Sequence, residues 1–240
     1  MTRKLRGLFT ALLFVTLCCA GAAAQGVGAG ARGLIASGNE RYARAEYEAA
    51  IKVYALVPAD AGEAYAQALY NIGVCRFELW QTEEAAAMYA RAVAARGGRY
   101  SKASYALGVA LEELGRRGEA KEAYARAASV GDYAPAHYKL GMFAAAAGDV
   151  ARAASHFREA VRRSKGRFPA SHNNLGVMLA RVGRLEEAER EFESALAESD
   201  KTFKEAAHNL ELCRALLAAG RAGGGAAEMK IAAAANGFSR

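Results

Sequence analysis

The chain has 240 residues, of which 53% are hydrophobic and only three are prolines, a composition typical of a folded, mainly helical protein. Its formal net charge is +7, but acidic residues alternate with basic ones, whereas nucleic-acid binders gather Lys and Arg on one face. Composition therefore argues against a disordered chain and against a nucleic-acid partner.

Residues 1–24 have the three parts of a secretory signal. Basic residues at the start precede an apolar run, 7–20, and small residues then lead to a cleavage site after Ala24. The apolar run is shorter than the roughly 20 residues that a membrane span needs. We therefore expect an exported protein from which the signal is removed, with residues 25–32 forming a flexible lead.

Two cysteines inside the signal leave a second possibility open. A lipoprotein signal ends in a cysteine that receives lipid, and a small residue should precede that cysteine. Here Leu17 precedes Cys18, and Cys18 precedes Cys19. A cleaved, free protein is therefore favoured over a lipid-anchored one, and membrane contact is expected only if Cys18 or Cys19 is lipidated.

From residue 33 to residue 219 the chain repeats a fixed set of residues: a Gly, an Ala twelve residues later, and a Tyr or Phe four residues after that. The glycines are Gly38, Gly73, Gly108, Gly141 and Gly176; the alanines are Ala50, Ala85, Ala120, Ala153 and Ala188; the aromatics are Tyr54, Tyr89, Tyr124, Phe157 and Phe192. A Gly inside a helix costs about 1 kcal/mol relative to Ala, so its repetition indicates two helices that cross closely.

Each repeat is predicted to be a pair of helices, with a break near Ala45, Trp80, Gly115, Gly148 or Gly183. No stretch has the alternation of a strand, so we predict an all-α fold, a right-handed α-solenoid of antiparallel helix pairs in which neighbours cover each other's apolar faces. The repeats are placed at 31–64, 66–99, 101–133, 134–167 and 169–202, followed by a capping helix at 203–219 and a Gly-rich linker and tail at 220–240.

The repeat resembles the tetratricopeptide repeat family. Its first-helix signature is similar to Tyr70-Asn71-Ile72-Gly73, Tyr105-Ala106-Leu107-Gly108, Tyr138-Lys139-Leu140-Gly141 and Asn173-Asn174-Leu175-Gly176. The third junction is two residues shorter than the others and is similar to the related Sel-one-like repeats. The resemblance implies a non-enzymatic scaffold that binds a protein or peptide partner.

In that family the first helices line a concave groove, so the positions three before and one after each Gly are implied to face the partner. These positions are Tyr70, Val74, Tyr105, Val109, Tyr138, Met142, Asn173 and Val177. An apolar strip with phenol groups suits an extended peptide or a helix, because Tyr offers both contact area and a hydrogen bond. The alternative is that these side chains merely pack on one another inside a narrow superhelix.

Some members of the family hold a peptide's terminal carboxylate with five residues, and the resemblance places Asn39, Asn71 and Lys102 at three of those positions. Ile35 and Ala106 occupy the other two and supply no charge. Because charge-assisted capture of a carboxylate is weakened without those cations, a complete clamp is not expected.

Trp80 stands at the turn of its repeat, where three of the other four repeats have Gly. Since turns are usually exposed, Trp80 is a weaker candidate for a partner contact, and packing on the adjacent turn is the alternative.

No catalytic, cofactor-binding or metal-binding motif is present. The four histidines, His137, His156, His172 and His208, lack the spacing of a metal site, and no phosphate loop or dinucleotide fingerprint occurs. Two cysteines, Cys75 and Cys213, lie at equivalent places in distant repeats and are expected to be buried rather than bridged. We therefore expect a scaffold of the periplasm or cell envelope without cofactor or small-molecule substrate. The alternative is a Sel-one-like or lipid-anchored structural adaptor that uses its convex face or its edges.

Overall fold

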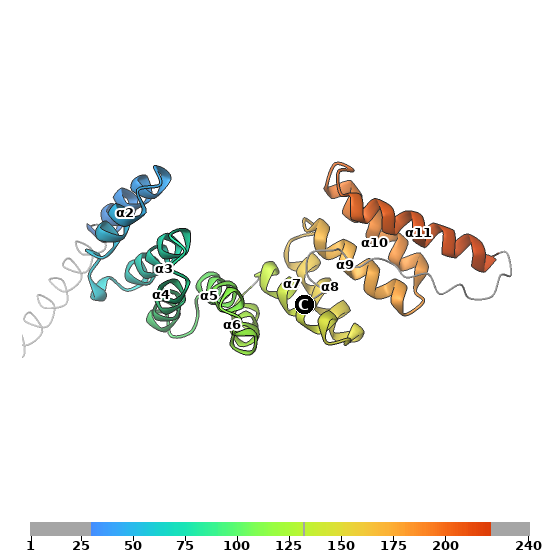
Figure 1. The fold of residues 1–240 in the computed structure, drawn as a ribbon, viewed down its shortest axis with the longest axis horizontal. Coiled ribbons are helices and arrows are strands. Elements are labelled where there is room, and N and C mark those ends of the chain that lie inside the picture. Colours follow the sequence, from blue (N-terminus) through green and yellow to red (C-terminus); the bar gives the residue numbers. More distant parts are fainter. Residues whose placement is uncertain (1–29, 132, 222–240) are drawn as a thin grey trace, which may run out of the picture. The chain divides into compact units, whose positions relative to one another are not determined.

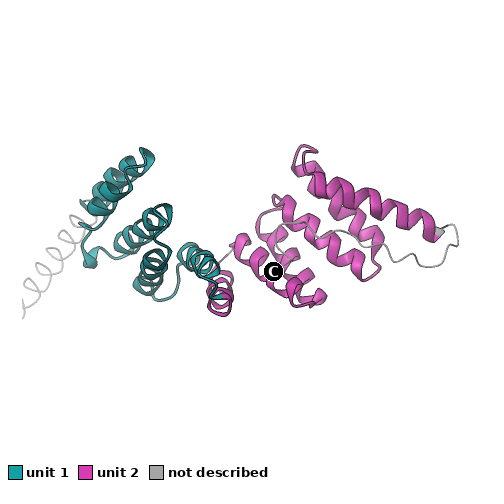
Figure 2. Ribbon diagram, viewed as in Figure 1, with its two compact units in different colours: residues 1–116 teal, residues 117–240 magenta. Residues whose placement is uncertain are grey.

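The computed structural model describes residues 30–131 and 133–221. The signal predicted at 1–24, which contains Cys18 and Cys19, and the tail after residue 221 lie outside the described residues. The chain divides into two compact units, residues 1–116 and 117–240 (Figure 2). The division falls in the turn between the two helices of the third repeat.

Helices joined by short turns make up the described residues, and no strand occurs among them (Figure 1). Unit 1 contains a helix over 30–43, α2 (Tyr47–Tyr54), a 3-10 turn (Ala59–Ala61), α3 (Glu63–Glu78), α4 (Thr82–Ala95) and α5 (Ser101–Glu113). Unit 2 contains α6 (Arg117–Ser129), α7 (Ala134–Ala146), α8 (Val150–Arg163), α9 (Pro169–Arg181), α10 (Leu185–Glu198) and α11 (Lys204–Arg221). Within each unit, every helix from α2 onward packs on the helix that follows it, which confirms the predicted all-α fold of helix pairs.

The breaks between the two helices of each repeat are confirmed by the backbone. The residue at each predicted break has a positive φ: 57° at Ala45, 59° at Trp80, 73° at Gly115, 76° at Gly148 and 79° at Gly183. The left-handed conformation costs a residue with a side chain roughly 1–2 kcal/mol, which explains why three of the five turns use Gly. Ala45 and Trp80 carry this cost in unit 1.

The repeated Gly makes room for the repeated aromatic ring. A Cβ atom added at Gly73 would lie 2.7 Å from the ring of Tyr89, and one added at Gly176 would lie 2.7 Å from the ring of Phe192. Real Cβ atoms do not approach other atoms this closely, so any larger residue would displace the ring. The predicted packing reason for the Gly is thus confirmed in both units, and the ring lies directly against the Gly.

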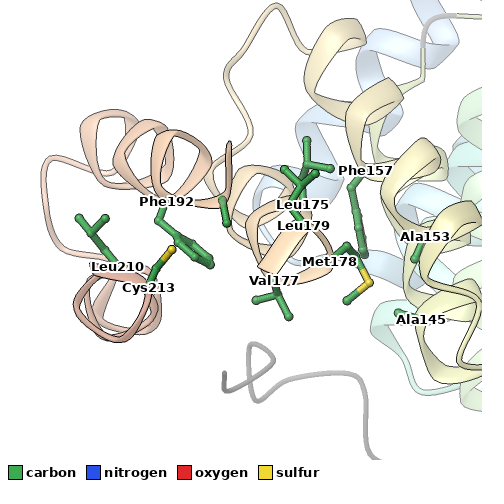
Figure 3. Packing of buried hydrophobic residues seen from close by; sticks show 11 residues of the cluster. Ala145, Ala153, Phe157, Leu175, Val177, Met178, Leu179, Phe192, Leu210 and Cys213 are labelled. Atoms are coloured by element: carbon green, nitrogen blue, oxygen red, sulfur yellow. The ribbon is translucent and has the colours of Figure 1, made fainter. Parts of the chain in front are cut away.

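The core of each unit is built from these rings and the alanines between them. All five repeated alanines are fully buried. In unit 2, Phe157 lies beside Met178 of α9, and Phe192 points toward Cys213 of α11 (Figure 3). Leu210 of α11 belongs to the same cluster, so α11 covers the last apolar face as a capping helix should.

Two predicted boundaries differ from the structure. The flexible lead predicted over 25–32 is wrong at its last three residues, because 30–32 are helical and Ala31 packs in the core with Ile35 one turn later. The capping helix does not end before Gly220 as predicted but runs to Arg221. None of the described helices is both long and apolar enough to span a membrane.

Candidate binding surface

In unit 1, the half-buried Tyr70 of α3 is the centre of an aromatic cluster that includes the buried Tyr89. Its ring centroid lies 5.6 Å from that of Tyr89 and 5.7 Å from that of Tyr100. The ammonium of Lys102 stands 4.9 Å from the centroid of the Tyr70 ring, a distance at which cation and ring attract. Lys102 is exposed, and no carboxylate of the described residues forms an ion pair with it.

Two of the amides predicted at clamp positions meet beside this cluster. Asn39 Oδ1 accepts a hydrogen bond from the hydroxyl of Tyr54 at 2.7 Å and another from Nδ2 of Asn71 at 3.2 Å. Burial raises the pKa of Tyr54 to about 12, so its hydroxyl remains a donor. Asn39 therefore links Tyr54 of its own repeat to Asn71 of the next repeat, whereas Lys102 lies over Tyr70.

The other predicted residues of unit 1 are half-buried. Val74 packs against a buried cluster that contains Tyr89 and Ala110. Tyr105 and Val109 lie on α5 and are likewise half-buried. Each of them retains some surface that a partner can contact.

In unit 2, Tyr138 and Met142 lie on α7 and meet a single amide of α9. The ring of Tyr138 lies 5.0 Å from that of Phe168 and 5.8 Å from that of Phe157. Nδ2 of Asn174 donates to the Tyr138 hydroxyl at 3.3 Å and lies 3.3 Å from the Met142 sulfur. Burial raises the pKa of Tyr138, so the phenol stays neutral. Both side chains are half-buried.

Asn173 and Val177 were predicted to face a partner, but both are buried, with exposed fractions of 0% and 1%. Neither side chain offers a surface that a partner can contact. Asn173 Oδ1 accepts from Nδ2 of Asn209 at 2.9 Å, and its own Nδ2 donates to Asn174 Oδ1 at 3.2 Å. Val177 is part of the buried apolar cluster of unit 2 (Figure 3). An amide that can both donate and accept thus links its neighbours into a buried network.

A further aromatic ladder was not singled out by the sequence pattern alone. It lies eight residues before the Gly of four repeats and consists of Tyr65, Tyr100, Tyr133 and Phe168. Tyr100 packs on Tyr70 of the preceding repeat, and Phe168 packs on Tyr138 in the same way. These aromatic residues form a fourth repeated series in the sequence, with the same spacing as the Gly series, and could have been found from that spacing.

Trp80 is 84% exposed at the turn between α3 and α4. The alternative that it packs on the adjacent turn is therefore wrong, since little of its surface is covered. An exposed Trp at a turn offers a large apolar contact area.

The described residues contain no group of three or more His, Cys, Asp and Glu side chains placed to hold a metal ion. Cys75 and Cys213 are both free and buried, as predicted. Burial raises the pKa of the Cys75 thiol to about 11, and burial also raises the pKa of Cys213. Both thiols are thus protonated at neutral pH and are weak nucleophiles.

Family models match most of the described repeats. One model, described as tetratricopeptide repeat, matches residues 105–168 and again 138–202, and a second model with the same description matches 67–95. Together these matches cover more than half of the chain. The first model runs through the short third junction, and the Sel-one-like character predicted there is not confirmed. No significant match was found among curated proteins.

Many solved structures share the fold. The crystal structure of MamA is 23% identical, with a TM-score of 0.56, over 70% of this chain and 96% of that one. YrrB, described as a TPR protein with an unusual peptide-binding site, is 24% identical, with a TM-score of 0.55, over 74% and 90%. PilF of Pseudomonas aeruginosa is 17% identical, with a TM-score of 0.58, over 79% and 93%. At these identities the likeness establishes the fold alone.

Proposed function

Because this chain belongs to the tetratricopeptide repeat family, we propose that it is an exported, non-enzymatic scaffold that binds a protein or peptide partner along the first helices of its repeats. Proteins of this family bind protein or peptide partners, and the similar YrrB is described as having a peptide-binding site. Stacked repeats of this kind present extended binding surfaces.

The observation that carries the proposal is the cluster around Tyr70. A phenol ring stands half-exposed, with the ammonium of Lys102 over it and the amide of Asn71 on the same helix. Such a surface offers apolar area, hydrogen-bond donors and a cation together, which suits an extended peptide better than a purely apolar ligand. The ring already packs in tilted contacts against Tyr89 and Tyr100, so less freedom is lost when a partner docks.

The N-terminal signal supports the location of this scaffold in the periplasm or cell envelope. A basic start, a short apolar run and small residues before Ala24 are the pattern of a cleaved secretory signal. Mass spectrometry of the mature N-terminus tests this: we expect the chain to start at Gln25. A mature chain that starts at Cys18 or Cys19 with an added lipid would overturn the free form and favour the anchored adaptor.

Crosslinked pull-down from the cell envelope tests the binding surface. The variant Tyr105→Glu with Tyr138→Glu places one carboxylate on the first-helix surface of each unit, and we expect it to lose the partner captured by the unaltered protein. The matched control carries Ala87→Glu and Ala151→Glu, at exposed positions on second helices of the two units. Thermal unfolding of both variants shows whether folding is retained.

The two outcomes separate the two functions. Loss of capture in the first-helix variant alone supports binding along the first helices. Retained capture in that variant, with loss in the second-helix control, would instead assign binding to the other face or the edges, where the exposed Trp80 lies at a turn.

A further inference from the structure

Two histidines face one another between α7 and α8 in the fourth repeat. The ring centroids of His137 and His156 lie 5.8 Å apart, with the ring planes inclined by 39°. Both side chains are half-buried, and both ring nitrogens of His137 are buried without a hydrogen-bond partner among the described residues. A proton added to His137 therefore places a positive charge where no acceptor receives it.

The charged groups around this pair are mostly basic. Lys121 comes from α6, and Arg152, Arg162 and Arg163 come from α8. The negative charge of Glu159 on α8 acts to raise the pKa of both histidines. However, Glu159 also accepts hydrogen bonds from Arg162 Nε at 2.9 Å and from Arg163 Nε at 2.6 Å. Among the described residues, no charged group of α7 or α9 is a main cause of the pKa shift of either histidine. These surroundings favour two neutral imidazoles.

Burial, followed by the charge of Arg163, lowers the pKa of His137, and burial, followed by the charge of Arg152, lowers the pKa of His156. Both folded-state values lie below the ordinary 6.5. The unfolded or locally opened chain thus binds more protons than the closed one. The contribution of the two neutral histidines to the free energy of unfolding is fully present above the unfolded-state pKa. It is lost as the pH falls through the folded-state pKa.

The fifth repeat has the opposite arrangement at the same register. His172 occupies the position of His137, and two carboxylates, Glu191 and Glu198, occupy the positions of the facing histidine and of the arginine seven residues after it. Nδ1 of His172 lies 2.6 Å from Glu191 Oε2, and Nε2 lies 3.2 Å from Glu198 Oε1. A protonated imidazole is therefore well placed between α9 and α10, whereas it is badly placed between α7 and α8.

We propose that His137 and His156 form an acid-sensitive lock in the fourth repeat: proton uptake at mildly acidic pH separates the two rings and loosens α7 from α8, while α9 and α10 stay closed. Because α7 also carries Tyr138 and Met142, this loosening weakens partner binding at that part of the surface. The loss of binding rests on the proposed function; the loosening itself does not.

Hydrogen exchange with mass spectrometry on the full chain tests the lock at about pH 7.5 and about pH 5.5, with rates corrected for intrinsic exchange. Linkage limits the effect to about tenfold per pH unit for each histidine, and we expect local opening of α7 and α8 to rise about threefold to tenfold in acid. Opening of α9 and α10 is expected not to rise. Equal protection of α7 and α8 at the two pH values would overturn the proposal.

Three variants assign the effect to the pair. His156→Glu places opposite His137 the residue that faces His172, and it should cancel or reverse the acid effect. His137→Phe keeps the ring and removes the proton site, so it should reduce the effect. His208→Phe, at an exposed position on α11, is the control and should leave the effect intact. An acid effect unchanged in His156→Glu overturns the proposal even if His137→Phe does not fold.

Discussion

The fourth repeat (α7 and α8) and the fifth repeat (α9 and α10) share one packing scheme but differ in the charges around an equivalent histidine. A Cβ at Gly141 would lie 2.6 Å from the ring of Phe157, and one at Gly176 would lie 2.7 Å from the ring of Phe192. The steric pattern is thus repeated closely, because every repeat must fit its neighbours. The half-buried polar positions are under no such constraint, so neighbouring repeats acquire different responses to pH.

The largest predicted effect tests the shared packing. Phe157→Ala and Phe192→Ala each remove a fully buried ring, and we expect each to cost about 3–5 kcal/mol of unfolding free energy. Urea unfolding followed by circular dichroism measures both. Similar values would confirm that the two repeats rely on the same contact. If one variant lost less than about 1 kcal/mol of unfolding free energy, the two repeats would not depend equally on this ring.

The second prediction concerns the sign of the pH dependence. Although burial by itself lowers it, the hydrogen bond and charge of Glu191 hold the pKa of His172 above the ordinary 6.5. The stabilisation is fully present below the unfolded-state pKa and is lost as the pH rises through the folded-state pKa. His172→Gln should therefore cost about 1.5–3 kcal/mol at about pH 5.5 and clearly less at about pH 9.

Thermal unfolding of this variant and the unaltered protein across that pH range gives the difference directly. A difference that is the same at every pH would show that His172 acts by packing alone. A difference that grows with rising pH would contradict the assignment of a charged imidazole between α9 and α10.

The third prediction separates the buried amide network of the fifth repeat from its counterpart in the fourth. Asn173→Ala leaves the buried amide of Asn209 without its partner and should cost about 1–3 kcal/mol. Tyr138→Phe, at the equivalent position of the fourth repeat, removes one hydroxyl from a half-buried site and should cost about 1 kcal/mol or less. Urea unfolding distinguishes them, and the reverse order would show that burial does not decide the cost.

The smallest prediction extends the comparison to the turns. The fourth and fifth repeats turn at Gly, whereas Trp80 takes the left-handed conformation in unit 1. Trp80→Gly relieves that strain and removes a side chain that is 84% exposed, so we expect a gain of about 0.5–1 kcal/mol. A fall in the melting temperature, measured by calorimetry, would mean that Trp80 stabilises the folded unit.

Much of the fold was predictable because its determinants are local. The Gly, Ala and aromatic series predicted the helix pairs, and the five break positions coincide with the residues of positive φ. The sequence pattern failed where a neighbouring repeat decides the outcome. Asn173 has the register of Tyr70 and Tyr105, yet its amide joins Asn174 and Asn209 in the core, and a register position alone does not carry that information.

The aromatic ladder between repeats also has a consequence for changes in chain length. Eight residues separate Ala92 from Tyr100, as they separate the equivalent pair before the fifth repeat, but only six separate Ala127 from Tyr133. Tyr133 nevertheless keeps its eight-residue distance to Gly141. The shorter spacing at this junction thus lies upstream of the aromatic residue and not downstream of it. A loop or tag that is inserted into this scaffold should therefore be tolerated best in the segment just before such an aromatic residue.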